Sequence, residues 1–508
     1  MQKEEMSMLD VSSLFTDGAV LCRDKEIRIF GMADSGSTVS VLLENASGQT
    51  LAEGVATAEN GHFLVCLPPQ KAQIGCRLRM MDGKNAVTAE DVAIGEVYLA
   101  GGQSNMELEL RNADEGPEEI ARTHDPMIRF FNVPRKAYES PEQQKALRET
   151  RWKAAAPENS GYNSAVAFFF AKKMREKYPD VAIGIIGCYW GGTSVTCWMD
   201  EETLEACGEG KRYLDEYAAK SGGKTMAEYL QEEEVFTRTL NDWNGRVAAY
   251  KEVHPGCAWQ EVEKACGACP WNPPAGPGSP YRPAGLFSAM LKQVCPIGLT
   301  AVLFYQGEED TGRTEHYDIL MTAMIGLWRE ALQDKELPFL FVQLPMWLDF
   351  GASDTFRWPL TRLAQAKVRD SVAHTGMICL LDQGEYGNIH PTCKRPVGER
   401  LAELAGAMLH GKGEVSPRVR LVSKTLDTIE VHLTQPVTTR DGKAPALMEI
   451  AGEDGVLVPA EAEIRDDMII LRSEKVKHPE KARYAWTDWS DRVNVFGLNG
   501  LPLEPFWV

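Results

Sequence analysis

The pattern of apolar and polar positions changes near residue 93. Before that point, short runs such as EIRIFGMA, TVSVLLEN and HFLVCLPP alternate apolar and polar residues, and turn-forming clusters such as ADSGS and AENG separate them. Alternation with a period of two is typical of strands that bury one face. Residues 1–93 are therefore predicted to form a small β-sandwich domain.

From residue 94 the apolar runs become continuous, as in VAIGIIGC, LTAVLFY, PFLFVQLP and GMICLL. Runs of this kind are expected where a strand is buried on both faces, as in a parallel sheet. Helical stretches lie between them, for example residues 164–176, with Asn163 or Ser164 as the cap, and residues 397–410. The alternation of strands and helices predicts a doubly wound α/β domain over residues 94–414.

Two further segments depart from this pattern. Residues 200–282 begin as a charged helical stretch and end in PWNPPAGPGSPYRP, and we interpret them as an insertion near the mouth of the site. After about residue 415, runs such as RVRLVSK, TIEVHL and MIILRSE predict strands again. Residues 415–508 are therefore expected to form a C-terminal β region.

Composition narrows the possible partners and compartments. Acidic residues outnumber basic ones 73 to 54, and the net charge of −19 argues against nucleic acid and anionic membranes as partners. The start of the chain, MQKEEMSMLDVSSLF, has charges of both signs and no continuous apolar segment, so we expect no signal peptide. No run approaches the length of a membrane span. With twelve scattered cysteines, a cytoplasmic protein with reduced thiols is the simplest expectation.

Chemically useful residues follow four of the buried runs. They are GQSN at 102–105, YWGGTS at 189–194, QGEED at 306–310 and DQGEYGNIHP at 382–391. Ligands of an open parallel sheet bind at the carboxyl ends of its strands, so these residues should meet. A serine, a histidine that can act as its base, and glycine turns and an amide that can stabilise an oxyanion form an acyl-transfer site. Taken alone, Ser104 could be a helix cap and His390 structural; their conjunction favours catalysis.

These motifs carry a family resemblance. GQSNM at 102–106, IGCYWGGTSVTCWM, FYQGEED and GNIHPTCKRPVGERLA together resemble the four blocks of the sialate O-acetylesterase family, a carbohydrate-esterase branch of the SGNH hydrolases. The stretches RIFGMADSGSTVSVLL and ARYAWTDWSDRVNVFGLNGLPLEPF resemble the family's first and last β segments, so the resemblance covers nearly the whole chain. It implies a serine esterase that releases acetate from O-acetylated sialic acid and needs no metal or organic cofactor.

The resemblance also implies roles for individual residues. Ser104 matches the nucleophile and His390 the general base. The backbone N–H groups of Ser104 and of the Gly191-Gly192 turn match the oxyanion hole, to which we add the side chain of Gln306. The residues expected to contact the acetylated sugar are Gln103, Trp190, Glu308, Asp310 and Arg282. Many SGNH enzymes have an asparagine at the position of Asp310; an ionised aspartate would repel an oxyanion, so we expect it to orient other groups.

The histidine departs from the superfamily pattern. An aspartate often stands three residues before it, and here that position is Gly387. Orientation of His390 must then come from Asp382, from Glu385 or from a backbone carbonyl. We favour Asp382, because it ends a buried strand and should be rigid.

Recognition of a sialate carboxylate calls for a cation, preferably an arginine. Arg282, upstream of the strand that leads to Gln306, is the first candidate, and Arg111 and Arg313 are the others. The alternative activity is deacetylation of neutral glycans such as xylan. From another class, a non-catalytic glycan-binding protein is conceivable, but the intact serine and histidine argue against it.

One rival motif lies in the insertion. The residues His254, Cys257, Cys266 and Cys269 have a spacing that can bind structural zinc. The other interpretation is an ordinary loop that contains thiols, and we expect no stoichiometric metal. Nothing in the sequence specifies an oligomeric state.

Overall fold

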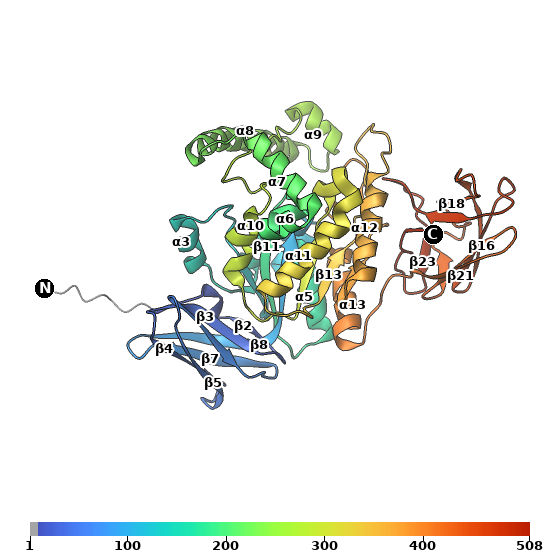
Figure 1. The fold of residues 1–508 in the computed structure, drawn as a ribbon. Coiled ribbons are helices and arrows are strands. Elements are labelled where there is room, and N and C mark those ends of the chain that lie inside the picture. Colours follow the sequence, from blue (N-terminus) through green and yellow to red (C-terminus); the bar gives the residue numbers. More distant parts are fainter. Residues whose placement is uncertain (1–8) are drawn as a thin grey trace.

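One large mixed sheet runs through the centre of the molecule in the computed structural model, which describes residues 9–508 (Figure 1). The expectation about a signal peptide concerns a segment that lies partly outside the described residues. The central path of the sheet is β10-β9-β11-β8-β12-β13-β14, with β8 (Ala86–Gly102), β9 (Asp125–Asn132), β10 (Lys153–Ala155), β11 (Ile183–Tyr189), β12 (Ala301–Tyr305), β13 (Phe339–Val342) and β14 (Thr375–Ile378). Strands β9 to β14 along this path are parallel, and β10 is an antiparallel edge.

Both faces of this sheet are buried, as the continuous apolar runs predict. Val97 and Leu99 of β8 belong to one hydrophobic core, whereas Tyr98 and Ala100 belong to the other. The covering helices are α11 (Tyr317–Ala331) on the first face, and α5 (Ala165–Lys177) and α13 (Arg395–His410) on the second. The predicted helix at residues 164–176 is confirmed, and the Ser164 side chain accepts the hydrogen bond of an N–H in its first turn.

Strand β8 is 17 residues long and belongs to two groups of strands. Its first part pairs antiparallel with β7 (Gln73–Met81), and its last part pairs parallel with β11 and β12. The other amino-terminal strands are β1 (Leu9–Val11), β2 (Val20–Cys22), β3 (Ile27–Ala33), β4 (Thr38–Glu44), β5 (Thr50–Thr57) and β6 (His62–Leu67). The predicted boundary between residues 93 and 94 therefore falls inside a continuous strand.

The segment at 200–282 forms a helical projection above the sheet (Figure 1). Its helices are α6 (Glu201–Ala206), α7 (Gly208–Ser221), α8 (Met226–Val253) and α9 (Trp259–Cys266), and an irregular stretch then returns to α10 (Gly285–Ala289). Shorter helices elsewhere are α2 (Gly116–Arg122), α3 (Pro141–Glu149) and α4 (Pro157–Ser160). Within residues 9–508, no helix has the length and apolar character that crossing a membrane requires.

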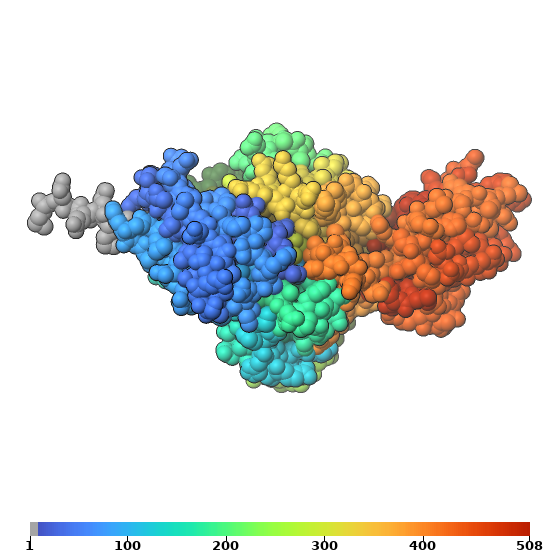
Figure 2. Space-filling view, turned by 90° about the horizontal axis from the view of Figure 1, so that it is seen from below, coloured from blue at the N-terminus to red at the C-terminus, as the bar shows by residue number. Residues whose placement is uncertain are grey.

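The last part of the chain forms small antiparallel sheets, and their core also includes Met346, Cys379 and Leu381 of the central part. Their strands are β15 (Val419–Lys424), β16 (Ile429–Leu433), β17 (Val437–Thr439), β18 (Met448–Ala451), β19 (Val458–Pro459), β20 (Glu461–Arg465), β21 (Met468–Arg472), β22 (Lys481–Tyr484), β23 (Val495–Gly497) and β24 (Phe506–Trp507). Figure 2 shows these sheets and the amino-terminal strands at opposite ends of the molecule.

The buried Asp488 joins the C-terminal sheets to the central part. Its carboxylate accepts hydrogen bonds from the backbone N–H and hydroxyl of Thr355, at 2.7 and 2.8 Å, and from the N–H of Trp358 at 3.0 Å. Trp358 lies in the first turn of α12 (Arg357–Ser371), whose free N–H groups favour an anion.

Candidate active site

Ser104 stands at the sharp turn that leaves the end of β8. It is the first residue of the short helix α1 (Ser104–Glu107). Gly102 has φ +129, and a Cβ there would collide with the Tyr305 carbonyl, so only glycine fits. The Oγ of Ser104 lies 2.8 Å from Nε2 of His390, which arrives in the loop after β14. The two residues predicted to react are brought together across 286 residues of sequence.

The loop that carries His390 is held by its own hydrogen bonds. The carboxylate of Glu385 accepts from Nδ2 of Asn388 at 2.7 Å and from the N–H of Thr392 at 3.2 Å. Oδ1 of Asn388 in turn accepts the N–H of His390 at 3.0 Å. Glu385 thus shapes the loop and does not contact the imidazole.

Although part of His390 is exposed, its surroundings keep the ring neutral. Desolvation by the surrounding protein, followed by the charge of Lys394, lowers the pKa of His390 to about 4. At neutral pH the imidazole is therefore free to accept a proton from the Ser104 hydroxyl.

The expectation that Asp382 orients His390 is wrong. Arg400 of α13 donates to both carboxylate oxygens of Asp382, at 2.7 and 2.8 Å. Burial opposes ionisation of this carboxyl, but the hydrogen bonds and charge of Arg400 outweigh it and lower the pKa of Asp382. In the described part of the chain, the only side-chain hydrogen bond of the His390 ring is the one to Ser104. The site is a serine–histidine pair without a carboxylate partner.

Gln306 is also placed differently from the prediction. Its buried amide Nε2 donates to the Asp310 carboxylate at 2.6 Å and to the Thr193 carbonyl at 3.1 Å, and its Oε1 accepts the Tyr317 hydroxyl at 2.8 Å. Both amide hydrogens are thereby used inside the protein. Gln306 holds neighbouring loops in place and offers no hydrogen to an oxyanion.

Of the two N–H groups predicted in the glycine turn, that of Gly191 is occupied. The N–H of Gly191 donates to the carboxylate of Glu107, which also forms an ion pair with Arg135. The N–H groups of Ser104, at the start of α1, and of Gly192 donate to no described residue. These two groups remain available for an oxyanion.

Two of the predicted substrate contacts, Glu308 and Asp310, are buried and bond to neighbouring parts of the protein. Glu308 accepts a hydrogen bond from Nδ2 of Asn105 at 2.6 Å. Asp310 accepts from the hydroxyl of Ser194 at 2.6 Å and from the N–H of Val195 at 2.9 Å. They fix the loops on either side of Ser104 and do not reach a substrate. The orienting role predicted for Asp310 agrees with these contacts.

Glu309 lies between them, has an exposed side chain, and was missed by the sequence reasoning. Desolvation and the charge of Asp310 raise its pKa to about 7. Glu309 is the one exposed residue of QGEED, and no alternation in the sequence marks it.

For Gln103 and Trp190, contact with a substrate stays a prediction. Oε1 of Gln103 accepts the N–H groups of Gly307 and Glu309 at 3.3 Å, which fixes the direction of the amide. Gln103 is buried, and its Nε2 donates to no described residue, so it is a free donor in the residue before Ser104. Trp190 is partly exposed.

The three predicted arginines are already engaged or enclosed. Arg111 pairs with Glu109, and Arg313 pairs with Glu216. Arg282 is partly buried, its Nη2 donates weakly to a backbone carbonyl at 3.4 Å, and burial lowers its pKa.

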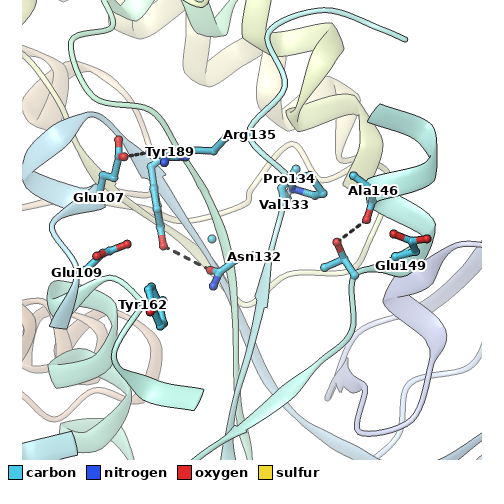
Figure 3. A pocket seen from close by; sticks show the side chains of 12 residues that line it. Glu107, Glu109, Asn132, Val133, Pro134, Arg135, Ala146, Glu149, Tyr162 and Tyr189 are labelled. Carbon is cyan, nitrogen blue, oxygen red and sulfur yellow. Dashed lines mark hydrogen bonds and ion pairs between the residues drawn. The ribbon is translucent and has the colours of Figure 1, made fainter. Parts of the chain in front are cut away.

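A cavity of about 420 Å³ opens beside α1 (Figure 3). Glu107, three residues after the serine, forms part of its wall together with Asn132, Arg135, Tyr162 and Tyr189. Figure 3 shows the Arg135 guanidinium against Glu107 and the Tyr189 hydroxyl against Asn132. Arg135, which the sequence reasoning overlooked, lines this cavity, pairs with Glu107 and has a side chain that is 53% exposed.

The four residues with zinc-like spacing do not form a metal site. Within residues 9–508, no three His, Cys, Asp or Glu side chains are arranged to hold a metal ion. The ring of His254 stacks on Tyr250 with centroids 4.2 Å apart, while Cys266 is buried and Cys269 exposed. The four residues lie instead at the end of α8, in the turn to α9, at the end of α9 and just after it.

The fold and the site define the class of protein: a carboxylic ester hydrolase built on an α/β sheet. The family model described as "carbohydrate esterase, sialic acid-specific acetylesterase" matches residues 94–215 and 271–405, and the chain belongs to this family. This confirms the resemblance seen in the motifs.

Known relatives extend over most of the chain. The sialate O-acetylesterases of Rattus norvegicus and Homo sapiens are each 24% identical over 94% of this chain, which covers 90% and 88% of their lengths. The crystal structure of a carbohydrate acetylesterase from Xanthomonas citri is similar with a TM-score of 0.76 and 28% identity, covering 99% of both chains. The mixed α/β architecture is thus shared with an acetylesterase.

Proposed function

We propose that the protein is a serine esterase that hydrolyses O-acetyl esters of sialic acid and releases acetate. The observation that carries this proposal is the 2.8 Å separation of Ser104 Oγ from Nε2 of a neutral His390. The family model and the sialate O-acetylesterase relatives support the substrate.

In this mechanism Ser104 Oγ attacks the acetyl carbonyl while His390 takes its proton. The tetrahedral intermediate then expels the sugar oxygen, which receives that proton, and leaves an acetyl group on Ser104. Water activated by His390 attacks this ester, and acetate leaves. The oxyanion is held by the free N–H groups of Ser104 and Gly192, with Nε2 of Gln103 as the side-chain donor.

We also propose that the chain is organised in three modules. An SGNH-type doubly wound domain at residues 94–414 would be flanked by an amino-terminal β-sandwich and a C-terminal β region, with β8 shared across the first boundary. Two cores on opposite faces of the central sheet support this arrangement. All twelve cysteines are free, which supports a reducing compartment such as the cytoplasm.

Arg135 is the group we assign to the sialate carboxylate, because its exposed side chain lies in the cavity beside α1; the carboxylate would compete with Glu107 for it. The second candidate function is deacetylation of a neutral glycan. Three carboxylates, those of Glu107, Glu109 and Glu149, line the same cavity, and they favour sugar hydroxyls over an anion.

The first test is the variant Ser104→Ala. It should fold normally and lose acetate release from O-acetylated sialic acid by about three orders of magnitude or more, because the nucleophile is gone. Ser371→Ala, at an exposed serine of α12, is the control. Near-normal turnover in Ser104→Ala would overturn the mechanism. Comparison of acetylated sialic acid with acetylated xylan fragments decides between the two substrates.

A further inference from the structure

The long helix α8 carries an aromatic residue at every seventh position: Tyr229, Phe236, Trp243 and Tyr250. Seven residues are almost two turns, so these side chains share one face. Each meets the chain that follows α8. Tyr229 packs on Gly276 and Gly278, Phe236 meets Trp271 with ring centroids 6.0 Å apart, Trp243 meets Trp259 at 6.0 Å, and Tyr250 stacks on His254.

This contact face of α8, which we name the aromatic ladder, fixes the returning chain along the helix. Tyr229 and Trp243 are buried, and the indole N–H of Trp243 donates to the Gly267 carbonyl at 2.9 Å. Tyr229, Trp243 and their partners therefore form a small core within the insertion, and this core does not depend on an exposed aromatic ring.

The ladder holds Trp271 against the glycine turn of the active site. A Cβ added at Gly192 would lie 2.9 Å from Cζ2 of Trp271 and 3.3 Å from Cε1 of Tyr281. A Cβ added at the preceding Gly191 would lie 3.2 Å from Cβ of Ser104. Trp271 thus packs on Gly192, and the glycine directly before it contacts Ser104.

Trp271 is 49% exposed although two rings hold it in place. It meets Phe236 on one side and Tyr281, at 5.5 Å between centroids, on the other, both edge to face. A large aromatic ring that is immobilised but open to solvent at the mouth of a site is suited to binding. The C–H bonds on one face of a pyranose ring form an apolar surface that packs on such a ring.

We propose that Trp271 is the stacking platform for the pyranose that carries the acetyl ester, and that the aromatic ladder of α8 exists to position it. The family model does not match residues 216–270, which contain the whole ladder, and resumes at Trp271 itself. The inserted helices thus add a sugar-binding wall beside the reaction centre. This inference rests on the proposed function, since it concerns the same site.

The test compares Trp271→Ala with Trp507→Ala, which removes an exposed tryptophan of the C-terminal sheets that has no contact with the ladder. For an acetylated sugar, Trp271→Ala should lower kcat/KM about tenfold through a higher KM. Turnover of ethyl acetate, which has no ring to stack, should stay within about twofold. Trp507→Ala should leave the ratio of the two activities unchanged, and Phe236→Ala should give a smaller loss specific to the sugar.

Binding of the deacetylated sugar by calorimetry, to Ser104→Ala with and without Trp271→Ala, is the second measurement. Weaker binding in the double variant supports the platform, and equal binding refutes it. A parallel loss of both ester activities would mean that Trp271 only maintains the fold. If Ser104→Ala remains an active esterase, the proposed function fails, while the binding comparison still decides the role of Trp271.

Discussion

His390 owes much of its electrostatic environment to Lys394, four residues further along the chain. The Lys394 side chain is buried, its ammonium donates to Oδ1 of Asn105 at 2.5 Å, and desolvation lowers its pKa to about 8. It is therefore largely charged at neutral pH, and that charge disfavours protonation of the histidine. Desolvation, with the added effect of this nearby cation, keeps the base neutral.

This predicts an unusual pH profile. Because a lowered pKa keeps the imidazole neutral to lower pH, kcat/KM for an aryl acetate should hold down to about pH 5 and fall only as the pH drops through about 4. In Lys394→Met the fall should move only part of the way toward the ordinary histidine pKa of about 6.5, because desolvation of the ring remains. The exposed Lys412 provides the control variant Lys412→Met. A native profile that already falls near 6.5 would contradict this account.

The serine and histidine could be predicted from sequence because each follows a buried run, and parallel strands bring such positions together. The roles of Asp382 and Gln306 could not. Each has the right chemistry at a strand end, but Arg400 saturates the first and Asp310 with Thr193 saturates the second. The hydrogen-bond partner of a polar group depends on how distant segments pack together. The periodicity of the sequence carries no information about that packing.

Among the elements, helices with clear caps and continuous strands were predictable, whereas the junctions between modules were not. The composition changes near residue 93, yet β8 passes through that point without interruption. Within the described residues, no strand continues from the central sheet into the C-terminal sheets. There the junction includes a buried carboxylate, Asp488 of the stretch TDWSD, which accepts hydrogen bonds at the start of α12.

We therefore expect Asp488→Ala to loosen this junction. Three donors around α12 would lose their charged acceptor, and the free energy of unfolding should fall by about 3 kcal/mol. Denaturant unfolding measures the loss, and limited proteolysis should show faster cleavage in the connection between α13 and β15. Asp491→Ala, at an exposed position nearby, should change neither. Unaltered stability of Asp488→Ala would show that other contacts hold the C-terminal sheets.

At the scale of the whole molecule, the net charge of −19 acts on any charged substrate. Its field repels a sialate carboxylate, and salt screens that repulsion. Raising the ionic strength from about 10 mM to about 300 mM should therefore increase kcat/KM for acetylated sialic acid severalfold and leave a neutral acetylated xylo-oligosaccharide unchanged. Steady-state kinetics at low substrate concentration provides the measurement. A decrease for the sialate would mean that the Arg135 side of the cavity dominates the local field.

The continuity of β8 limits how the modules of this protein can be exchanged during evolution. Its first half completes the amino-terminal strands, its second half is the central strand of the catalytic sheet, and β2 pairs with it across the junction at residues 93–95. Recombination that joined a foreign amino-terminal module at this point would have to supply half of a strand in the correct register. The segment from β1 to the serine turn should therefore descend as one unit, whereas the helices at 216–270, which enter and leave on the surface, can be gained or lost without disturbing the sheet.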